Sequence, residues 1–236
     1  MSTIPDICTM FILLTAATTF EIQPAIDFLQ KSPFDPGRHE IHWLITGVGS
    51  LATSHSLMRQ IGRRKPDLIL QAGIAGCFVN GHLGEVVAIR EDTPGDMGVW
   101  EEGAFKSLFE LNLAGRNEPP FSNGLLPNPH TTLLTLSKLP QVRGISVNVI
   151  TTEKSRIQWY QQNIAPFVES MEGASLHYTC LQENISFLQM RSISNDMGVR
   201  DKSKWDIKGA IVNLNQHLTR LLQSLALQES LPSATK

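Results

Sequence analysis

The sequence predicts an α/β fold: a three-layer sandwich in which helices flank a mixed, mostly parallel central sheet, in a single domain over residues 1–236. Two observations predict this fold. Short apolar runs typical of buried strands alternate along the chain with segments of helical spacing. No internal repeat and no Pro/Ser-rich linker divides the chain, whose length suits one large domain. Residues 1–9 precede the first predicted strand and are a candidate disordered end.

Apolar runs bounded by turn-forming residues predict the strands, and helical spacing or capping predicts the helices between them. The predicted strands cover 11–16, 40–46, 67–72, 84–90, 142–150 and 185–193. The predicted helices cover 24–30, where Pro24 fits a first turn, and 51–61, 153–163, 171–183 and 205–227. The acidic segment 91–102 and the Pro- and Gly-rich segment 114–130 are predicted to be loops, the second of the kind that forms a lid or an interface.

Composition excludes several classes of protein. Apolar residues make up 42% and charged residues 18% of the chain, against a norm of roughly 25% charged, so we expect a substantial core. The formal net charge of −2 shows no basic excess, which argues against a nucleic-acid partner. The apolar run 10–14 is far shorter than the roughly 20 residues of a membrane span, and 1–9 lack the positive charge of a secretory signal. We therefore expect a cytoplasmic protein with no membrane partner.

Neither cysteines nor histidines form a metal-binding pattern. Cys8, Cys77 and Cys180 lie far apart, and their odd number suits free thiols in a reducing compartment. His39 and His42 are three apart, which places them on opposite faces of a strand. We expect no metal.

A glycine-rich turn follows the second predicted strand. Residues 47–52 match the dinucleotide pattern GxGxxG/A, which also needs an acidic residue about 20 positions on, at the end of the next strand. Asp67 lies near that distance but begins a strand. The pattern therefore favours a tight turn whose backbone approaches a smaller ligand, and we expect no cofactor.

Polar and glycine residues gather where predicted parallel strands end, the edge at which such sheets bind ligands. Glu21 follows the first strand, and it also fits the ordinary role of a helix-start carboxylate. Glu172 lies among apolar and small residues, where a carboxylate is costly unless it is hydrogen-bonded. A ligand with two adjacent hydroxyls would satisfy it.

Several ordered motifs resemble those of the purine nucleoside phosphorylases and their nucleosidase relatives, from 13 to about 222. The motifs are TTFEI (18–22), TGVGS (46–50), KPDLILQAGIAG (65–76) with GEVV (84–87), SMEGA (170–174) and RSISND (191–196). Segments 91–113, 168–174 and 193–205 look most like the branch that hydrolyses futalosine to hypoxanthine and dehypoxanthine futalosine in menaquinone biosynthesis.

The resemblance implies a catalytic and a ribose-binding role for two carboxylates. Glu21 would orient and deprotonate the attacking water, while Glu172 would accept hydrogen bonds from the ribose hydroxyls above Met171. Asn195 stands where adenosine-type nucleosidases have Asp, and its amide suits O6 and N7 of a 6-oxopurine. Asp196 remains the rival for serving the leaving base. The remaining purine- and nucleoside-binding positions are Val48, Gly73 and Ile74.

The 5′ substituent of futalosine carries a benzoate-type tail, which needs a cation and an aromatic surface. Arg200 and Lys202 are candidates for its carboxylate, and Trp100 and Phe105 for its ring. Arg200 also fits a surface pair with Asp201. Relatives complete this end of the site with a neighbouring subunit, so the resemblance implies a homodimer or larger homo-oligomer.

The resemblance also indicates hydrolysis. Phosphorolytic relatives hold phosphate with an arginine and a serine or threonine, at positions that are Gln71 and Ile74 here. Neither supplies charge, and Glu21 would repel phosphate. Two alternatives stay open: a methylthioadenosine/S-adenosylhomocysteine nucleosidase, and a non-catalytic nucleoside-binding member of the fold, against which the presence of both glutamates argues.

Overall fold

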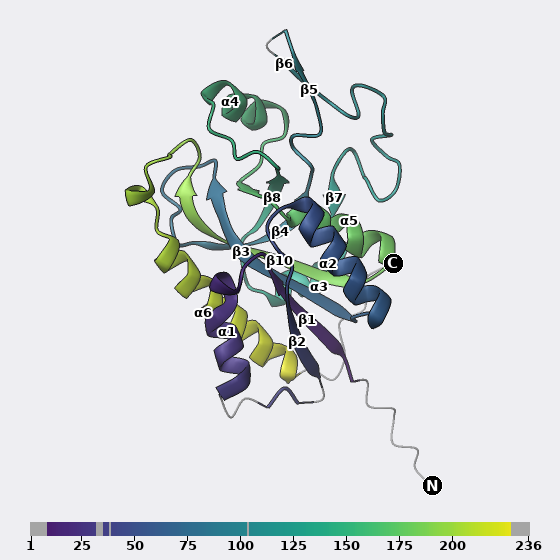
Figure 1. Ribbon diagram of the computed structural model, residues 1–236, viewed down its shortest axis with the longest axis vertical. Helices are drawn as coiled ribbons and strands as arrows, with labels where there is room; N and C mark the ends of the chain where they lie inside the picture. Colours follow the sequence, from purple (N-terminus) through teal and green to yellow (C-terminus); the bar gives the residue numbers. More distant parts are fainter. Residues whose placement is uncertain (1–8, 32–34, 38, 103, 228–236) are drawn as a thin grey trace.

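The computed structural model describes residues 9–31, 35–37, 39–102 and 104–227. Within these residues the strands form one large sheet and one two-stranded hairpin (Figure 1). The strands of the large sheet are β1 (Phe11–Ala16), β2 (Glu40–Ile45), β3 (Leu68–Cys77), β4 (Val86–Asp92), β7 (Leu126–Pro127), β8 (Gln141–Ser146), β9 (Val168–Ser170) and β10 (Ser186–Asp196). The hairpin consists of β5 (Gly98–Glu101) and β6 (Ala104–Ser107).

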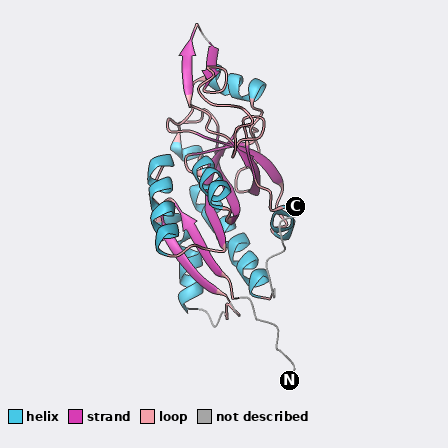
Figure 2. Cartoon of the chain, turned by 90° about the vertical axis from the view of Figure 1, so that its right-hand side faces the viewer, coloured by secondary structure: helices cyan, strands magenta, loops and turns pink. Residues whose placement is uncertain are grey.

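Helices connect these strands. They are α1 (Thr19–Lys31), α2 (Ser50–Arg63), α3 (Thr131–Leu136), α4 (Lys154–Asn163), α5 (Gly173–Glu183) and α6 (Ile207–Ala226), with a 3-10 turn at Lys202–Lys204. Two views place the β5–β6 hairpin at one end of the molecule (Figures 1 and 2). No helix in the described ranges is long and apolar enough to cross a membrane.

The sheet is mixed and mostly parallel, as the sequence predicts. Its strands follow the order β2–β1–β3–β9–β8–β4–β10, and β10 also pairs with β3. The pairings of β3, β10, β4, β8 and β9 therefore run in a closed circuit, which an open sandwich would not have. Strands β1, β3 and β10 are parallel neighbours, and their carboxyl ends lie at one edge.

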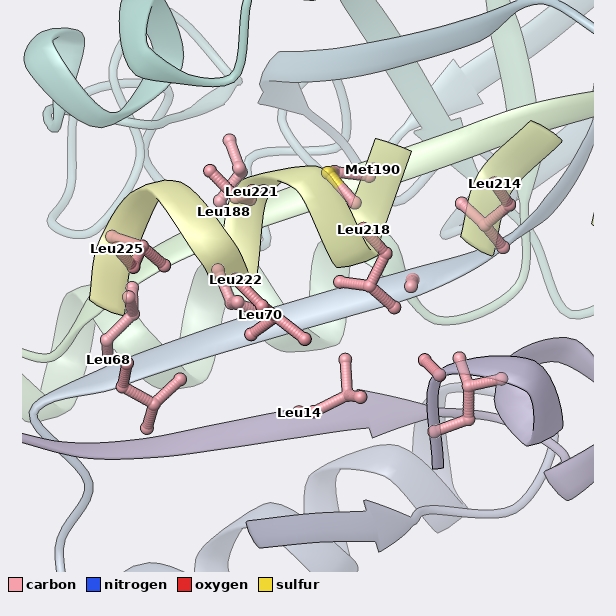
Figure 3. Close-up of a cluster of buried hydrophobic side chains, with 14 of the residues drawn as sticks. Leu14, Leu68, Leu70, Leu188, Met190, Leu214, Leu218, Leu221, Leu222 and Leu225 are labelled. Carbon is pink, nitrogen blue, oxygen red and sulfur yellow. The ribbon is translucent and has the colours of Figure 1, made fainter. Parts of the chain in front are cut away.

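Helices cover both faces of the β1–β3–β10 region, which explains why these strands read as continuous apolar runs. Ile12 and Leu14 of β1 pack with residues of α1 and α6. Figure 3 shows this core, in which Leu14, Leu70 and Met190 lie beside leucines of α6. Phe11 and Leu13 point the other way and pack with Leu57 of α2 and Leu176 of α5. Each fully buried leucine contributes about 1.5–3 kcal/mol relative to exposure.

Element boundaries differ from prediction where they matter for the site. Helix α1 begins at Thr19, five residues before Pro24, so Glu21 lies in its first turn. Strand β3 continues to Cys77, so Gly73, Ile74 and Gly76 lie inside the strand and not after it. Strand β10 continues to Asp196 and carries Asn195 near its end.

Other predictions were wrong or incomplete. The strand expected over 142–150 ends at Ser146, and the segment expected to be a loop over 91–102 contains β5. The short elements α3 and β9 were not predicted, because six- and three-residue elements show no period. Cys77 and Cys180 are buried free thiols, whereas Cys8 lies outside the described residues. The described residues contain no cluster of three or more His, Cys, Asp or Glu that could hold a metal.

Candidate active site

A cavity of about 270 Å³ lies at the carboxyl ends of β1, β3 and β10. Most of the residues that the sequence singles out line it: Glu21, Val48, Ile74, Met171, Glu172, Asn195 and Arg200. Gly73, Asp196, Trp100 and Phe105 do not line it. The cavity thus collects side chains from β3, β10 and the starts of α1 and α5, which are far apart in the sequence.

Glu21 is fixed in the first turn of α1, with 7% of its surface exposed. Its Oε2 accepts hydrogen bonds from the backbone N–H and the hydroxyl of Thr18, at 3.0 and 3.1 Å. Its Oε1 accepts a bond of 3.1 Å from the N–H of Ile74 in β3. A carboxylate has about four acceptor positions, so one on Oε1 stays available for a ligand or a water.

Glu172 precedes α5 and is 5% exposed. Its Oε1 accepts from the N–H of Gly49, at 3.0 Å, and its Oε2 is paired with Arg191, at 3.2 Å. Gly49 has φ +90°, a conformation that favours glycine, so the turn that the sequence identified serves to hold this carboxylate. The cost of burying Glu172 is therefore offset by a cation and a backbone donor.

Arg191 of β10 is one of two residues of the candidate site that sequence reasoning missed. It is 2% exposed, and its Nε and Nη2 donate to the side-chain Oε1 atoms of Gln189 and Gln71, each at 3.0 Å. Its Nη1 reaches Glu172 and, at 3.5 Å, the carbonyl of Ile74. A Cβ on Gly73 would lie 2.4 Å from Nη1, so glycine is needed there for the guanidinium to pass. An arginine inside the apolar strand 185–193 was the signal that could have identified it.

A third buried carboxylate, Asp92, is linked to this arginine through Gln189. Asp92 is fully buried and accepts hydrogen bonds from Gln189, at 3.0 Å, from Ser146, at 2.9 Å, and from the N–H of Thr93, at 2.8 Å. Burial raises the pKa of Asp92 to about 6, despite these bonds. Gln189 therefore bridges Asp92 to Arg191, and the chain of bonds continues to Glu172.

Asn195 and Asp196 have different surroundings. The amide of Asn195 lines the cavity; its Oδ1 accepts from the Ser194 hydroxyl at 2.9 Å, and its Nδ2 donates to the Asp196 carbonyl at 3.1 Å. Asp196 does not line the cavity, and its buried Oδ1 has no hydrogen-bond partner among the described residues. This geometry favours Asn195 over Asp196 as the residue beside a bound base.

Another carboxylate that sequence reasoning missed, Glu169 of β9, also lines the cavity and is 6% exposed. Its Oε1 accepts from the N–H of Thr151 at 3.0 Å, while Oε2 has no hydrogen-bond partner in the described chain. Burial raises the pKa of Glu169 above its ordinary value. The three-residue strand that carries it gave no periodic signal.

Of the residues expected to bind a 5′ substituent, one lines the cavity and the two aromatic ones lie elsewhere. Arg200 lines the cavity and lies over the Trp205 ring, 5.9 Å from its centroid. Trp100 and Phe105 lie in the hairpin and pack on Trp159, with ring centroids 6.1 and 5.1 Å away. Within one chain neither ring lines the cavity, so their role at a 5′ substituent stays a prediction.

Comparison with known proteins agrees with this architecture. A futalosine hydrolase of Thermus thermophilus is 28% identical over 184 residues, covering 76% of this chain and 80% of the relative. A 5′-methylthioadenosine/S-adenosylhomocysteine nucleosidase of Shewanella baltica is 25% identical over 201 residues, covering 81% and 80%. No family model matches the chain.

Solved structures share the fold. The native structure of futalosine hydrolase of Helicobacter pylori superposes with a TM-score of 0.74 at 16% identity, covering 91% of this chain and 98% of that one. A 5′-methylthioadenosine/S-adenosylhomocysteine nucleosidase of the same organism gives 0.74 at 16% identity, covering 92% and 99%. In sequence and in fold the chain is therefore similar to futalosine hydrolases and to 5′-methylthioadenosine/S-adenosylhomocysteine nucleosidases.

Proposed function

We propose that this protein hydrolyses the N-glycosidic bond of futalosine and releases hypoxanthine and dehypoxanthine futalosine. The observation that carries the proposal is the placement of two buried carboxylates, Glu21 and Glu172, in one cavity. Ile74 contacts Glu21 directly and the arginine partner of Glu172 through its carbonyl oxygen. The Ile74 N–H donates to Glu21, and the Ile74 carbonyl is 3.5 Å from the arginine nitrogen that pairs with Glu172.

Each carboxylate has a separate task in this reaction. Cleavage of a glycosidic bond passes through an oxocarbenium-like state, which a nearby negative charge stabilises. Glu172 would bind the ribose hydroxyls, and Met171 beside it would pack under the sugar. Glu21 would use its remaining acceptor position on Oε1 to hold the attacking water and take its proton.

Water is the nucleophile that the electrostatics favour. Gln71 and Ile74 stand where phosphorolytic relatives hold phosphate, but an arginine from another strand, Arg191, passes directly beside Gly73. Its charge is compensated by Glu172, and its nitrogens already donate to Gln71 and Gln189. An arginine with these partners holds the Glu172 carboxylate in place. Little uncompensated charge and few free N–H donors remain on it to bind a phosphate dianion.

The leaving base would be held by Asn195, whose amide can donate to O6 or N7 of hypoxanthine. Val48 and Ile74 would complete the nucleoside site, and Arg200 at the rim would bind a carboxylate on the 5′ substituent. Trp100 and Phe105 would reach such a substituent only from a neighbouring copy. We propose that the protein acts as a homodimer or larger assembly of single-domain chains.

One assay separates this function from its neighbours. Purified protein would be offered futalosine, inosine and methylthioadenosine, with and without inorganic phosphate, while free base is measured. We expect hypoxanthine release from futalosine to be fastest and independent of phosphate. Faster adenine release from methylthioadenosine would instead favour the second candidate function, a methylthioadenosine/S-adenosylhomocysteine nucleosidase. The 25% identical nucleosidase of Shewanella baltica supports that candidate.

A further inference from the structure

Three neighbouring strands present one surface to the candidate base site. Gly76 of β3 pairs with Asn195 of β10 on one side and with Glu169 of β9 on the other. Residues paired across strands point to the same face, so Asn195 and Glu169 flank a position that has no side chain. Their Cα atoms are two strand spacings, about 10 Å, apart.

The missing side chain at Gly76 keeps this surface open. A Cβ there would lie 2.8 Å from Met197 Sδ and 3.2 Å from Asn195 Nδ2. Met197, Asn195 and Glu169 all line the cavity, together with Ile150 and Thr151 of the facing loop. The result is a slot with apolar walls and two polar groups, an arrangement that suits the edge of a flat heterocycle.

Glu169 has unused hydrogen-bonding capacity in this slot. It is 6% exposed, its carboxylate accepts the single described bond from Thr151, and Oε2 has no partner in the described residues. The terminal torsion of a glutamate is broad, so a small rotation turns a free lone pair towards the cavity. A buried carboxylate with so few donors is costly without a ligand.

We propose that Glu169 accepts the N1–H of a 6-oxopurine and, with Asn195, selects such bases over 6-aminopurines. A 6-oxopurine presents an acceptor, O6, beside a donor, N1–H, whereas adenine presents an amino donor beside an acceptor, N1. Asn195 offers donors and Glu169 offers only acceptors while ionised. The pair therefore matches the oxo base and opposes the amino base. This inference rests on the proposed function for the identity of the cavity as the base site.

The test variant is Glu169→Gln, because its amide oxygen still accepts from Thr151 while its other terminal atom becomes a donor. Glu153→Gln is the matched control, since Glu153 is exposed at the start of α4 and makes no side-chain cap bond. Dissociation constants would be measured by calorimetry for hypoxanthine, 1-methylhypoxanthine and adenine. The methylated base lacks the N1–H, so it provides a probe on the wild-type protein that does not depend on any variant.

We expect the wild type to bind hypoxanthine about 10-fold or more tightly than 1-methylhypoxanthine. Glu169→Gln should shrink that difference and shift the hypoxanthine-to-adenine affinity ratio about 10-fold towards adenine, while Glu153→Gln changes neither. Equal wild-type affinity for the methylated and unmethylated bases overturns the inference. Equal weakening of all bases in Glu169→Gln also overturns it, because that is the result of a merely structural role.

Futalosine hydrolysis by the wild type is scored separately. If futalosine is not hydrolysed but the base affinities follow the expected pattern, the proposed function fails and the assignment of Glu169 stands. If futalosine is hydrolysed but the affinity ratio is the same in wild type and Glu169→Gln, the proposed function stands and the assignment of Glu169 fails.

Discussion

Arg191 and Glu172 form an ion pair of 3.2 Å in which the two side chains are only 2% and 7% exposed. Such a pair gains little for stability as a whole, because both charges lose their water. Together with the Gly49 N–H, it fixes the position of a carboxylate that lines the cavity. The pair is also linked through Gln189 to Asp92, so three charged groups share one buried network.

Replacing Arg191 should therefore lower the free energy of unfolding far more than replacing an exposed arginine. We expect Arg191→Met to lower the free energy of unfolding by about 3–5 kcal/mol, because Glu172 is left as a buried, unpaired charge. Arg90→Met is the control, since Arg90 is about half exposed and pairs with Glu91 at 3.3 Å; its loss should stay under about 1 kcal/mol. Urea unfolding measures both, and equal losses would contradict the burial argument.

Glu21→Gln tests the proposed base. The single amide oxygen of glutamine can accept from either Ile74 or Thr18 but not from both, so we expect the fold to be retained with a modest loss of stability. The amide cannot take a proton from water. We expect turnover to fall by about 10²–10⁴. Steady-state hydrolysis of futalosine measures the effect, with circular dichroism to confirm folding. Near-normal turnover would remove Glu21 from the chemistry.

Asn195→Asp tests how the leaving base is served. An aspartic acid can donate a proton to N7 of adenine, whereas an amide cannot. We expect the ratio of adenine to hypoxanthine release to rise, measured with methylthioadenosine and futalosine as competing substrates. Asp196→Asn is the companion variant and should leave the ratio unaltered, because Asp196 does not line the cavity. The opposite pattern would transfer the role to Asp196.

The raised pKa of Asp92 predicts that the stability of the fold depends on pH. Its pKa is raised from 3.8 to about 6 in the folded protein, so the native state keeps a proton that the unfolded chain releases. The free energy of unfolding should therefore fall as pH rises from about 4 to 6, by up to about 3 kcal/mol from this group. Asp92→Asn should remove that component, and Asp35→Asn on an exposed turn should not. Denaturant unfolding at several pH values measures it, and unchanged pH dependence in Asp92→Asn would refute the assignment.

Self-association would involve the mouth of the cavity. Phe20 and Val48 line the cavity and are 65% and 56% exposed, and Leu51, three residues after Val48, is 88% exposed. Exposed apolar side chains gathered in this way are typical of an interaction surface. We expect Leu51→Glu to weaken assembly, measured by sedimentation at several concentrations. A matched exchange at Leu227, 87% exposed at the end of α6, should have no effect. A wild-type chain that stays monomeric would refute the proposal.

The sequence predicted what depends on local pattern. Buried strands with helices on both sides left a continuous apolar signal, and this placed Glu21 and Asn195 at the correct edge. Glu172 was recognisable because a carboxylate among small and apolar residues needs a partner. These inferences required only the neighbours of each residue in the chain.

What the sequence could not predict depends on contacts across the sheet. Arg191 becomes significant only through Gln71 and Glu172, which lie 120 and 19 positions away from it. Glu169 becomes significant only because Gly76 lies between it and Asn195. Trp100 does not line the cavity of its own chain, because the hairpin that carries it packs on Trp159.

The closed circuit of strand pairings bears on how copies of this protein can meet. Strands β3, β4, β8, β9 and β10 have neighbours on both sides, whereas β2 pairs with β1 alone in the described chain. Strand β2 begins with Glu40, which pairs with His42 at 2.8 Å and with Arg64 at 2.6 Å. A free strand edge invites another chain to add to the sheet, and charged side chains oppose this. We therefore expect copies of this protein to associate through side-chain surfaces. The charges near the free edge of β2 oppose the addition of further strands there, which would otherwise lead to aggregation.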